Sequence, residues 1–497
     1  MFKTSLLCTI ALILLALSFA PLSSAAQTKS RVITGATVID GSGSRRFRAN
    51  VRIEGDRITK VGRFALLPGE EVIDADGMIV APGFIDIHNH SEQGLTTEPT
   101  AASQVSQGIT TLAVGPDGGS PWPVSEYLGK IEQRTAVNVL AFVGHATVRL
   151  RVMGQDYKRA ATEKEIAQMV ELVKQGMREG AVGLSTGLEY DVGNPSTTEE
   201  VIALARASAR HGGIYMSHIR DEADLTISAL EEAIRIGREA RVPVQISHIK
   251  MGTVGVWGKA RNAVALIARA RRSGLDITAD CYPYDAWAST ITVLIPSRRH
   301  DDPVAVKRGL DDVGGAANVL VTSCRAHADY EGKNLEEIAR EQRVTPVDVY
   351  IQIVKDGGAG VVCRSMKESD MRAFYSQPWV MVSSDGGIGT RHPRGAGTFP
   401  RVLGRYARDQ KWLTLEEAIR KMTSAPASRL GLKDRGLIRE GMKADLVIFN
   451  PQTVVDRSTF KEPQLLSTGI ERVWVNGEAV WESGKPTGKL SGIVIRK

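Results

Sequence analysis

The sequence predicts a (β/α)8 TIM barrel joined to a small β-sandwich that both chain ends build together. The middle of the chain alternates short apolar runs with amphipathic helical patterns, the order typical of a parallel α/β fold. The two ends instead contain short β-rich runs separated by turns with glycine. Polar residues, histidines above all, follow the apolar runs of the middle, where barrel enzymes place their catalytic groups.

The N-terminus has the features of a secretory signal peptide, which we place at residues 1–26. Lys3 precedes an apolar stretch at 6–20, and small residues follow at 23–26. A retained membrane anchor is the alternative, but this stretch is short for a spanning helix. We therefore expect a secreted or periplasmic protein without stable membrane anchoring after cleavage.

The β-sandwich is predicted from residues 27–77 and 430–497. The N-terminal part contains short strand-like runs and a hairpin turn at Gly55-Asp56. The C-terminal part repeats this pattern, with a turn at Asn476-Gly477. Since strand patterns gather at both ends, we expect the two parts to form one unit.

The barrel is predicted from residues 78–429. Amphipathic helices are expected at 162–179, 198–211 and 225–240. The segment 288–375 exceeds one helix, so we expect it to include a lid or subdomain. Eight apolar runs are candidate strands: 79–87, 110–115, 138–144, 181–188, 213–217, 243–247, 276–282 and 379–384.

The composition of the 497 residues is that of an ordinary globular protein, with 42% hydrophobic and 24% charged residues. The net charge of +7 includes no uninterrupted Lys or Arg run, so nucleic acid is not an expected partner. Signal cleavage would leave Cys281, Cys324 and Cys363, too few for a disulfide framework. A homo-oligomer is compatible with the sequence, which does not specify one.

A His-x-His pair, His88 and His90, ends the first barrel run. Side chains alternate along a strand, so both imidazoles point to one side and can chelate one metal ion. Such a pair is weak evidence alone, but polar residues follow the other runs as well. They are Asp117, His145, Glu189, His218, His248, Tyr282, Tyr284 and Asp385.

These motifs together resemble the amidohydrolase superfamily and, more closely, its D-aminoacylases (N-acyl-D-amino-acid deacylases). The order of His88, His90, His218, His248 and Asp385 carries the superfamily resemblance. The resemblance to D-aminoacylases extends from about residue 31 to the C-terminus. Its motifs include 108–111, 144–149, 183–190, 217–222, 247–250, 282–284, 383–386 and 392–400.

The resemblance implies metal-dependent hydrolysis of the amide bond of N-acyl-D-amino acids, or of dipeptides with a C-terminal D-residue. It implies two zinc ions per chain, although other divalent metals also suit His and carboxylate ligands. His88, His90 and Asp385 would hold one ion, and His218 and His248 the other. The expected partner is a small molecule with a free carboxylate.

One departure from the family concerns the loop after the second strand. The familiar D-aminoacylases carry a metal-binding cysteine there, in an Asn-Cys-Gly context, whereas this chain has Pro116-Asp117-Gly118. Histidines alone would leave the charge of the dication uncompensated, so another anion is needed. We favour Glu189 as the ligand between the two ions, with Asp117 as its competitor. Each carboxylate also has a structural alternative to metal binding. Asp117 would then be a turn residue, and Glu189 would pair with an arginine.

The resemblance also assigns catalytic roles. A bound zinc ion lowers the pKa of water to about 7 and polarises a carbonyl. Asp385 occupies the position of the superfamily's proton shuttle, which takes a proton from the attacking water and passes it to the leaving amine. His145 is expected either to polarise the substrate carbonyl or to hydrogen-bond a metal ligand.

Substrate binding requires groups for the free carboxylate. By resemblance, Tyr190, Lys250, Tyr284 and Ser289 are candidates for this role. Lys250 lies two residues past His248 and shares its face, and its cation suits an anionic substrate. If an arginine lines the side-chain pocket, acidic D-amino acids would be preferred; the candidates are Arg149, Arg220 and Arg391, the last in a loop expected to be mobile.

Two other functions are compatible with the sequence. A cyclic-amide hydrolase of dihydroorotase or hydantoinase type is the first, but those enzymes usually have lysine at the position of Glu189. A metal-free barrel that acts as a binding protein is the second. Such a protein should have lost its ligands, whereas the expected positions are filled here.

Overall fold

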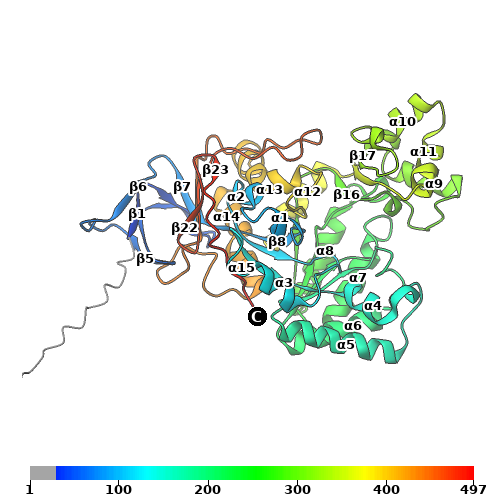
Figure 1. Ribbon diagram of the computed structural model, residues 1–497, viewed down its shortest axis with the longest axis horizontal. Helices are drawn as coiled ribbons and strands as arrows, with labels where there is room; N and C mark the ends of the chain where they lie inside the picture. Colours follow the sequence, from blue (N-terminus) through cyan, green and yellow to red (C-terminus); the bar gives the residue numbers. More distant parts are fainter. Residues whose placement is uncertain (1–29) are drawn as a thin grey trace, which may run out of the picture.

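The computed structural model describes residues 30–497, so the predicted signal peptide lies outside the described residues. Within this range, no helix is both long and apolar enough to cross a membrane. Figure 1 shows a β-rich unit at one side, a central barrel with its helices, and a smaller unit beyond it.

The β-rich unit consists of two sheets built from both ends of the chain. The cluster between them includes Ile33, Val51, Ile53, Leu446 and Trp474. One sheet has the order β5 (Arg57–Gly62), β4 (Asn50–Glu54), β1 (Arg31–Thr34) and β6 (Glu71–Asp74). The other has the order β23 (Lys485–Pro486), β22 (Glu478–Glu482), β21 (Ile470–Val475), β20 (Leu446–Phe449), β7 (Ile79–Pro82), β2 (Thr37–Val38) and β3 (Phe47–Arg48).

The central unit is a closed parallel barrel, which confirms the predicted fold class. A bridge between Asn89 and Gly386 joins the first strand to the chain after the last one. Neighbouring strands pair in parallel, as a (β/α)8 barrel requires. The strands are β8 (Phe84–Asn89), β9 (Ile109–Val114), β10 (Asn138–Ala141) continued by β11 (Val143–Gly144), β12 (Gly183–Gly187), β13 (Ile214–His218), β14 (Val244–Ile246), β15 (Ile277–Cys281) and β19 (Val380–Val382).

The predicted first barrel strand, 79–87, is in fact two strands that meet at Gly83. β7 pairs with β20 in the sandwich, and β8 starts the barrel. At the junction, the Gly83 N–H donates to the carbonyl of Asp445 over 2.8 Å. A Cβ on Gly83 would lie 2.3 Å from the Thr110 side chain, so the chain crosses between sheets where only glycine fits. Both strands are buried, which is why the sequence shows one continuous apolar run.

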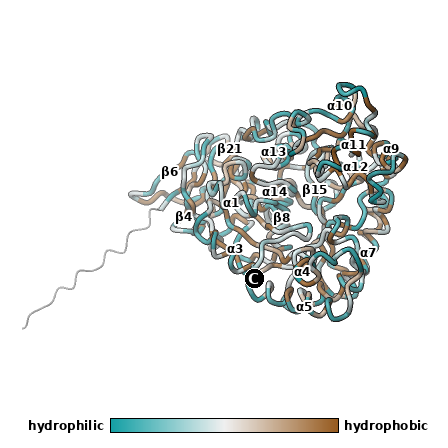
Figure 2. The backbone as a smooth tube through the Cα atoms, turned by 45° about the vertical axis from the view of Figure 1, so that its right-hand side comes forward, coloured by the Kyte–Doolittle hydropathy of each residue, from teal (hydrophilic) through white to brown (hydrophobic). Residues whose placement is uncertain are grey.

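Two of the helices around the barrel begin where their capping residues predict. Thr162 caps α5 (Glu163–Arg178) with a capping box to Glu165, and Thr197 caps α6 (Thr198–Arg210). In Figure 2, hydrophobic and hydrophilic stretches alternate along the chain, as expected when one helix face packs on a sheet. The other helices are α1 (Gly94–Thr97), α2 (Ala102–Val105), α3 (Val124–Ile131), α4 (His145–Met153), α7 (Thr226–Ala240), α8 (Ala260–Arg272), α12 (Glu368–Tyr375), α13 (Arg394–Arg401), α14 (Leu415–Met422) and α15 (Ser424–Leu430).

The segment between β15 and α12 forms a subdomain of its own. Its antiparallel sheet has the order β16 (Trp287–Thr290), β18 (Gly360–Cys363) and β17 (Val319–Ser323). Three helices complete it: α9 (Pro303–Asp312), α10 (Leu335–Gln342) and α11 (Pro346–Lys355). A separate apolar cluster that includes Ile295, Val306 and Tyr350 stabilises this subdomain. Figure 1 shows it at the side of the barrel away from the sandwich.

Candidate metal centre and substrate cavity

A cavity of about 1080 Å³ lies at the carboxyl ends of the barrel strands. The barrel contributes residues that follow its strands, among them Asp117, Glu189, His248 and Asp385. The subdomain contributes part of the opposite wall, including Ser289 of β16. Active sites of (β/α)8 barrels lie at this end, so the cavity is the candidate functional site.

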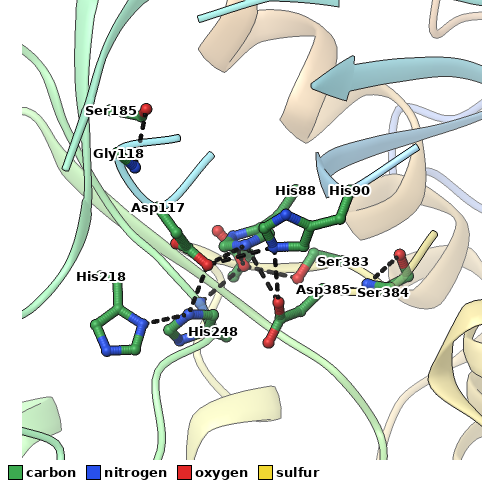
Figure 3. Close-up of polar contacts among 12 residues, drawn as sticks. His88, His90, Asp117, Gly118, Ser185, His218, His248, Ser383, Ser384 and Asp385 are labelled. Atoms are coloured by element: carbon green, nitrogen blue, oxygen red, sulfur yellow. Dashed lines mark hydrogen bonds and ion pairs between the residues drawn. The ribbon is translucent and has the colours of Figure 1, made fainter. Parts of the chain in front are cut away.

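Asp117 lies at the centre of the polar groups that face this cavity. Its Oδ2 atom is 3.2 Å from Nε2 of His88, 3.3 Å from Nε2 of His90 and 3.5 Å from Nε2 of His248. Asp385 approaches from the opposite side, with Oδ1 3.3 Å from Nε2 of both His88 and His90. Figure 3 shows these side chains converging from different strands. Ligand atoms of His88, Asp117, His248 and Asp385 all lie within 4.8 Å of one another.

The backbone at three of these residues is left-handed, which is uncommon for residues other than glycine. The φ angles are 55° at Asp117, 31° at His248 and 48° at Asp385. Such conformations cost about 1–3 kcal/mol each and persist where the surrounding structure enforces them. They often occur at functional sites, and here they direct side chains from three different strand ends toward one point.

Close backbone packing holds the loop that carries Asp117. A Cβ at Gly187 would lie 2.3 Å from the carbonyl oxygen of Asp117, and a Cβ at Gly144 equally close to that of Gly118. Ser185 on β12 accepts from the N–H of Gly118 over 3.2 Å, as Figure 3 shows. Residues of β11 and β12 therefore fix the direction of the Asp117 carboxylate.

A second group of side chains adjoins the first through His248. Nδ1 of His218 is 3.0 Å from Nε2 of His248, and Nε2 of His218 is 2.8 Å from Oε2 of Glu189. The hydroxyl of Tyr190 lies 3.1 Å from Nδ1 of His218. Glu222 adds a carboxylate, with Oε1 3.0 Å from Nδ1 of His248. Sequence reasoning did not single out Glu222, although the motif 217–222 contains it.

Burial and the neighbouring charges together shift the pKa values of these groups. Burial disfavours the charged imidazoles, but Asp117 and Asp385 outweigh it and raise the pKa of His88 well above its usual value. In the same way, the pKa of His90 rises to about 9. Burial also disfavours the charged carboxylate of Asp117, but His88 and His248 hold its pKa well below the usual value. The carboxylates are therefore stable as anions and face nitrogen donors.

The donor set fits a divalent metal such as zinc. Zinc in proteins takes imidazole nitrogens and carboxylate oxygens, the donor atoms that converge in this cluster. Among the described residues, Oδ1 of Asp117 and Nδ1 of His88 are buried without a hydrogen-bond partner. A buried carboxylate oxygen without a donor is stabilised when its carboxylate binds a cation.

Arg394 is a further member of the site, found in the structure and not by sequence reasoning. Its Nη1 lies 2.7 Å from Oδ2 of Asp385, and its guanidinium stacks 4.7 Å from the ring centre of Tyr282. Burial disfavours the charged form of Asp385, but Arg394 and the nearby histidines hold the pKa of this carboxyl well below its usual value. Arg394 belongs to the motif 392–400, whereas sequence reasoning had singled out Arg391, just before that motif.

Asp280 supports the cluster from inside the barrel. Its Oδ1 accepts from the backbone N–H of His248 over 2.9 Å and from the hydroxyl of Ser383 over 2.6 Å. The same oxygen lies 3.6 Å from Nδ1 of His88. Gln245 donates to the other carboxylate oxygen over 2.7 Å. Asp280 thus connects three of the strand ends that carry the site.

Four of the predicted site residues lie outside the cavity lining: His88, which is fully buried within the histidine cluster, and three that lie away from that cluster. His145 is fully buried with Nε2 2.8 Å from Oε1 of Glu200, because α4 begins at this residue and turns the ring toward α6. Its predicted roles, polarising the substrate carbonyl or supporting a metal ligand, are therefore not supported. Tyr284 is buried, and its hydroxyl donates to Asp456 over 3.2 Å. Arg391 is about half exposed and pairs with Glu331 of the subdomain.

The other predicted substrate-binding residues do line the cavity. They are Tyr190, Lys250 and Ser289. Nζ of Lys250 lies 2.6 Å from Oε2 of Glu222 and 2.7 Å from Nδ1 of His248. The ammonium group is thus next to the histidine cluster, where its charge suits an anionic group of a substrate.

Comparisons with known proteins agree with this geometry. A model of the amidohydrolase family matches residues 71–481. The D-aminoacylase of Alcaligenes xylosoxydans xylosoxydans is 36% identical over 94% of this chain and 97% of its own length. The N-acyl-D-glutamate deacylase of the same organism is 37% identical over 94% of this chain and 96% of its own length.

A solved structure shares the fold over nearly the whole described chain. It is the N-acyl-D-glutamate deacylase from Bordetella bronchiseptica, complexed with zinc and with a phosphonate inhibitor that mimics the tetrahedral intermediate. The alignment has a TM-score of 0.85 and 34% sequence identity, and it covers 94% of this chain and 99% of that one.

Proposed function

The chain belongs to the amidohydrolase family, and we propose that it hydrolyses the amide bond of N-acyl-D-amino acids or of dipeptides with a C-terminal D-residue. The observation that carries this proposal is the convergence of four histidines and the carboxylates of Asp117 and Asp385 beside the cationic Lys250. The histidines and the two carboxylates suit metal-assisted hydrolysis. The ammonium group of Lys250 suits a substrate with a free carboxylate.

His88, His90 and Asp385 would hold one zinc ion, and His218 and His248 the second. When bound, the metal lowers the pKa of a water molecule and polarises the scissile carbonyl. We propose Asp117, rather than Glu189, as the ligand between the ions. Asp117 contacts histidines of both groups, whereas Glu189 contacts His218 alone. Its position in the chain is also where the D-aminoacylases carry their cysteine.

Asp385 would act as the proton shuttle. The ion pair with Arg394 keeps its carboxylate ionised, which is the form that accepts a proton from the attacking water. Transfer of that proton to the amide nitrogen then converts the nitrogen into a leaving amine. Arg394 would keep the carboxylate in position during both transfers, because a 2.7 Å ion pair on a buried arginine restricts its rotation.

The α-carboxylate of the substrate would bind Lys250, with Ser289 and Tyr190 as hydrogen-bond partners on the cavity wall. A lysine ammonium has three donors, so Lys250 can keep its contact with Glu222 and still donate to a substrate oxygen. Ser289 comes from β16 and would close the opposite side of the carboxylate.

We further propose that the substrate's side chain is neutral. Among the described residues, the cations that line the cavity are Lys130, Lys250 and Arg394. Lys130 is 64% exposed and pairs with Glu126, and the other two have the roles given above. The three arginines considered from the sequence are engaged elsewhere: Arg149 with Glu200, Arg220 with Glu232 and Arg391 with Glu331. Apolar residues of the cavity wall include Val293, Leu294, Pro296 and Val313.

The test is amine release by the zinc-loaded mature protein, starting at about residue 27. Paired libraries of N-acetyl-D- and N-acetyl-L-amino acids and L-Xaa-D-Xaa dipeptides would serve as substrates. We expect turnover of D-substrates, with N-acetyl-D-leucine or N-acetyl-D-methionine preferred over N-acetyl-D-glutamate and N-acetyl-D-aspartate. Turnover of cyclic amides instead would support the dihydroorotase or hydantoinase type. Failure of the purified protein to bind zinc, together with no turnover of either class, would support a binding function.

We also propose that the protein is exported and processed near residue 26. The sequence of charged, apolar and small residues at 1–26 supports this. The mass of the protein recovered from the periplasm or medium of a bacterial host would test it. Recovery of the full-length chain in the membrane fraction would indicate a retained anchor.

A further inference from the structure

We propose that Glu222 is a positioning residue that couples the metal ligand His248 to the substrate-binding Lys250. The inference rests on the function proposed above. It concerns one carboxylate whose two oxygens serve two different parts of the site.

The geometry assigns each oxygen of Glu222 its own nearest partner, and Oε2 also lies 3.8 Å from Nε2 of His218. Oε1 lies 3.0 Å from Nδ1 of His248, and Oε2 lies 2.6 Å from Nζ of Lys250. All three side chains are withdrawn from solvent, with exposures of 13% for Glu222, 3% for Lys250 and 2% for His248. Burial of this kind strengthens the charged hydrogen bonds and makes the loss of a partner costly.

The backbone fixes Glu222 against the strand that carries its partners. Gly252 lies two residues after Lys250, and its N–H donates to the carbonyl of Glu222 over 3.0 Å. A Cβ at Gly252 would lie 2.7 Å from that carbonyl oxygen, so the two segments touch. The chain after β13 is thereby held against the chain after β14, and the reach of the Glu222 side chain is set.

The position of one proton explains why this carboxylate matters. Nε2 of His248 faces Asp117 and His218, so this is the nitrogen that would bind metal and must be free of a proton. The proton then belongs on Nδ1, which has two charged neighbours in the described chain, Glu222 and Lys250.

Those two neighbours favour opposite proton positions. The Glu222 carboxylate can only accept, so it favours the proton on Nδ1 and leaves Nε2 free. The Lys250 ammonium can only donate, so as the sole partner of Nδ1 it would favour the proton on Nε2, where metal must bind. Glu222 binds Lys250 with one oxygen and His248 with the other. A cationic substrate-binding group can therefore lie beside a metal ligand, although Nζ of Lys250 is only 2.7 Å from Nδ1 of His248.

The test measures zinc affinity and Michaelis constants in single and double variants. Glu222→Gln should weaken zinc binding by roughly 10–100-fold, the usual effect of removing the hydrogen-bond partner of a metal ligand. Its KM should also rise, because glutamine has one neutral acceptor oxygen in place of the two anionic oxygens that serve His248 and Lys250. Lys250→Met alone should raise KM and leave zinc affinity near that of the wild type.

The double variant, Glu222→Gln with Lys250→Met, is the decisive one. Removal of the competing donor should restore most of the zinc affinity that Glu222→Gln loses, while KM stays high. Zinc affinity is measured by competition with a chromophoric chelator, and the visible spectrum of the cobalt-loaded protein reports the ligand geometry. Glu222→Asp, which keeps the charge but is too short to reach both partners, should also weaken zinc binding.

Asp221→Asn is the matched control, because the carboxylate of Asp221 accepts from the backbone of Ala223 and Leu225 and not from the site. Circular dichroism of the zinc-free proteins checks that each variant is folded. Unchanged zinc affinity in Glu222→Gln, or no recovery in the double variant, would overturn the proposal. Loss of one whole zinc ion in every Glu222 variant would instead make Glu222 a direct ligand. Since zinc binding is measured without substrate, these outcomes are independent of whether D-substrates are hydrolysed.

Discussion

Arg394 and Asp385 form a buried ion pair beside the histidine cluster, with Nη1 2.7 Å from Oδ2. Both side chains are only 7% exposed, so solvent does not screen their interaction effectively. The other carboxylate oxygen of Asp385 faces His88 and His90. Asp385 therefore has one oxygen for the guanidinium and one for the histidine side of the site, as expected of a group that must stay ionised and oriented.

Replacement of Arg394 by methionine should shift the pH dependence of the reaction. Without the guanidinium, the pKa of Asp385 rises, because only the histidines then oppose the effect of burial. The ionised form is the one proposed to act, so activity is lost as the pH falls through this pKa. The acidic limb of the kcat/KM profile should therefore move to higher pH by at least about one unit. An unchanged acidic limb would separate Arg394 from the ionisation of Asp385.

Replacement of Asp385 by asparagine should separate metal binding from turnover. The four histidines and Asp117 remain, so most of the bound metal should stay. Loss of the proton shuttle should lower kcat by about 10²–10⁴-fold. Metal content by mass spectrometry and initial rates measure the two effects. Asp276→Asn is the control, because Asp276 pairs with Arg429 just before β15, at the opposite end of the barrel. Normal turnover in Asp385→Asn would remove Asp385 from the mechanism.

The roles of Asp117 and Glu189 can be compared with a matched pair of amide variants. Asp117→Asn should weaken zinc binding by more than about 100-fold, beyond the effect of losing a ligand's hydrogen-bond partner. Glu189→Gln should have the smaller effect, since Glu189 contacts His218 alone among the four histidines. Equilibrium dialysis against buffered zinc measures both affinities. A larger loss in Glu189→Gln would restore Glu189 to the position between the ions.

The barrel could be predicted from sequence because its strands are buried on both faces and therefore appear as continuous apolar runs. The same property hid the junction at Gly83, where two buried strands of different sheets follow each other without a polar residue. The metal-site histidines could be predicted because a strand end fixes both position and direction. His218 and His248 are examples, since His218 ends β13 and His248 lies two residues after β14.

The contacts that sequence reasoning did not predict depend on geometry that no local pattern encodes. Asp117 reaches three histidines because of its left-handed backbone and the glycine contacts beneath it. His145 points to α6 because a helix begins at that residue. Arg391 and Arg394 lie three positions apart, and only the tertiary fold determines that Arg394 is buried while Arg391 is exposed.

Lys421 offers a prediction about stability that does not involve the metal centre. It lies in α14, its side chain is 1% exposed, and its ammonium donates to the carbonyls of Gln377 and, over 2.7 Å, Val380. Burial lowers its pKa from 10.5 to about 8. Between pH 8 and pH 10.5, Lys421 has therefore lost its proton in the folded protein but still binds it in the unfolded chain.

The sign of the effect follows from this difference in proton binding. Where the unfolded chain binds more protons, the free energy of unfolding rises with pH, so Lys421 costs stability below pH 8 and the cost is relieved between pH 8 and 10.5. The full relief corresponds to about 3 kcal/mol.

Relative to Lys421→Met, the wild type should therefore gain roughly 2–3 kcal/mol of unfolding free energy between pH 7.5 and pH 10. Urea unfolding at both pH values measures this gain, and Lys433→Met, at an exposed position, is the control. Equal pH dependence in the wild type and Lys421→Met would mean that the buried lysine keeps its ordinary pKa.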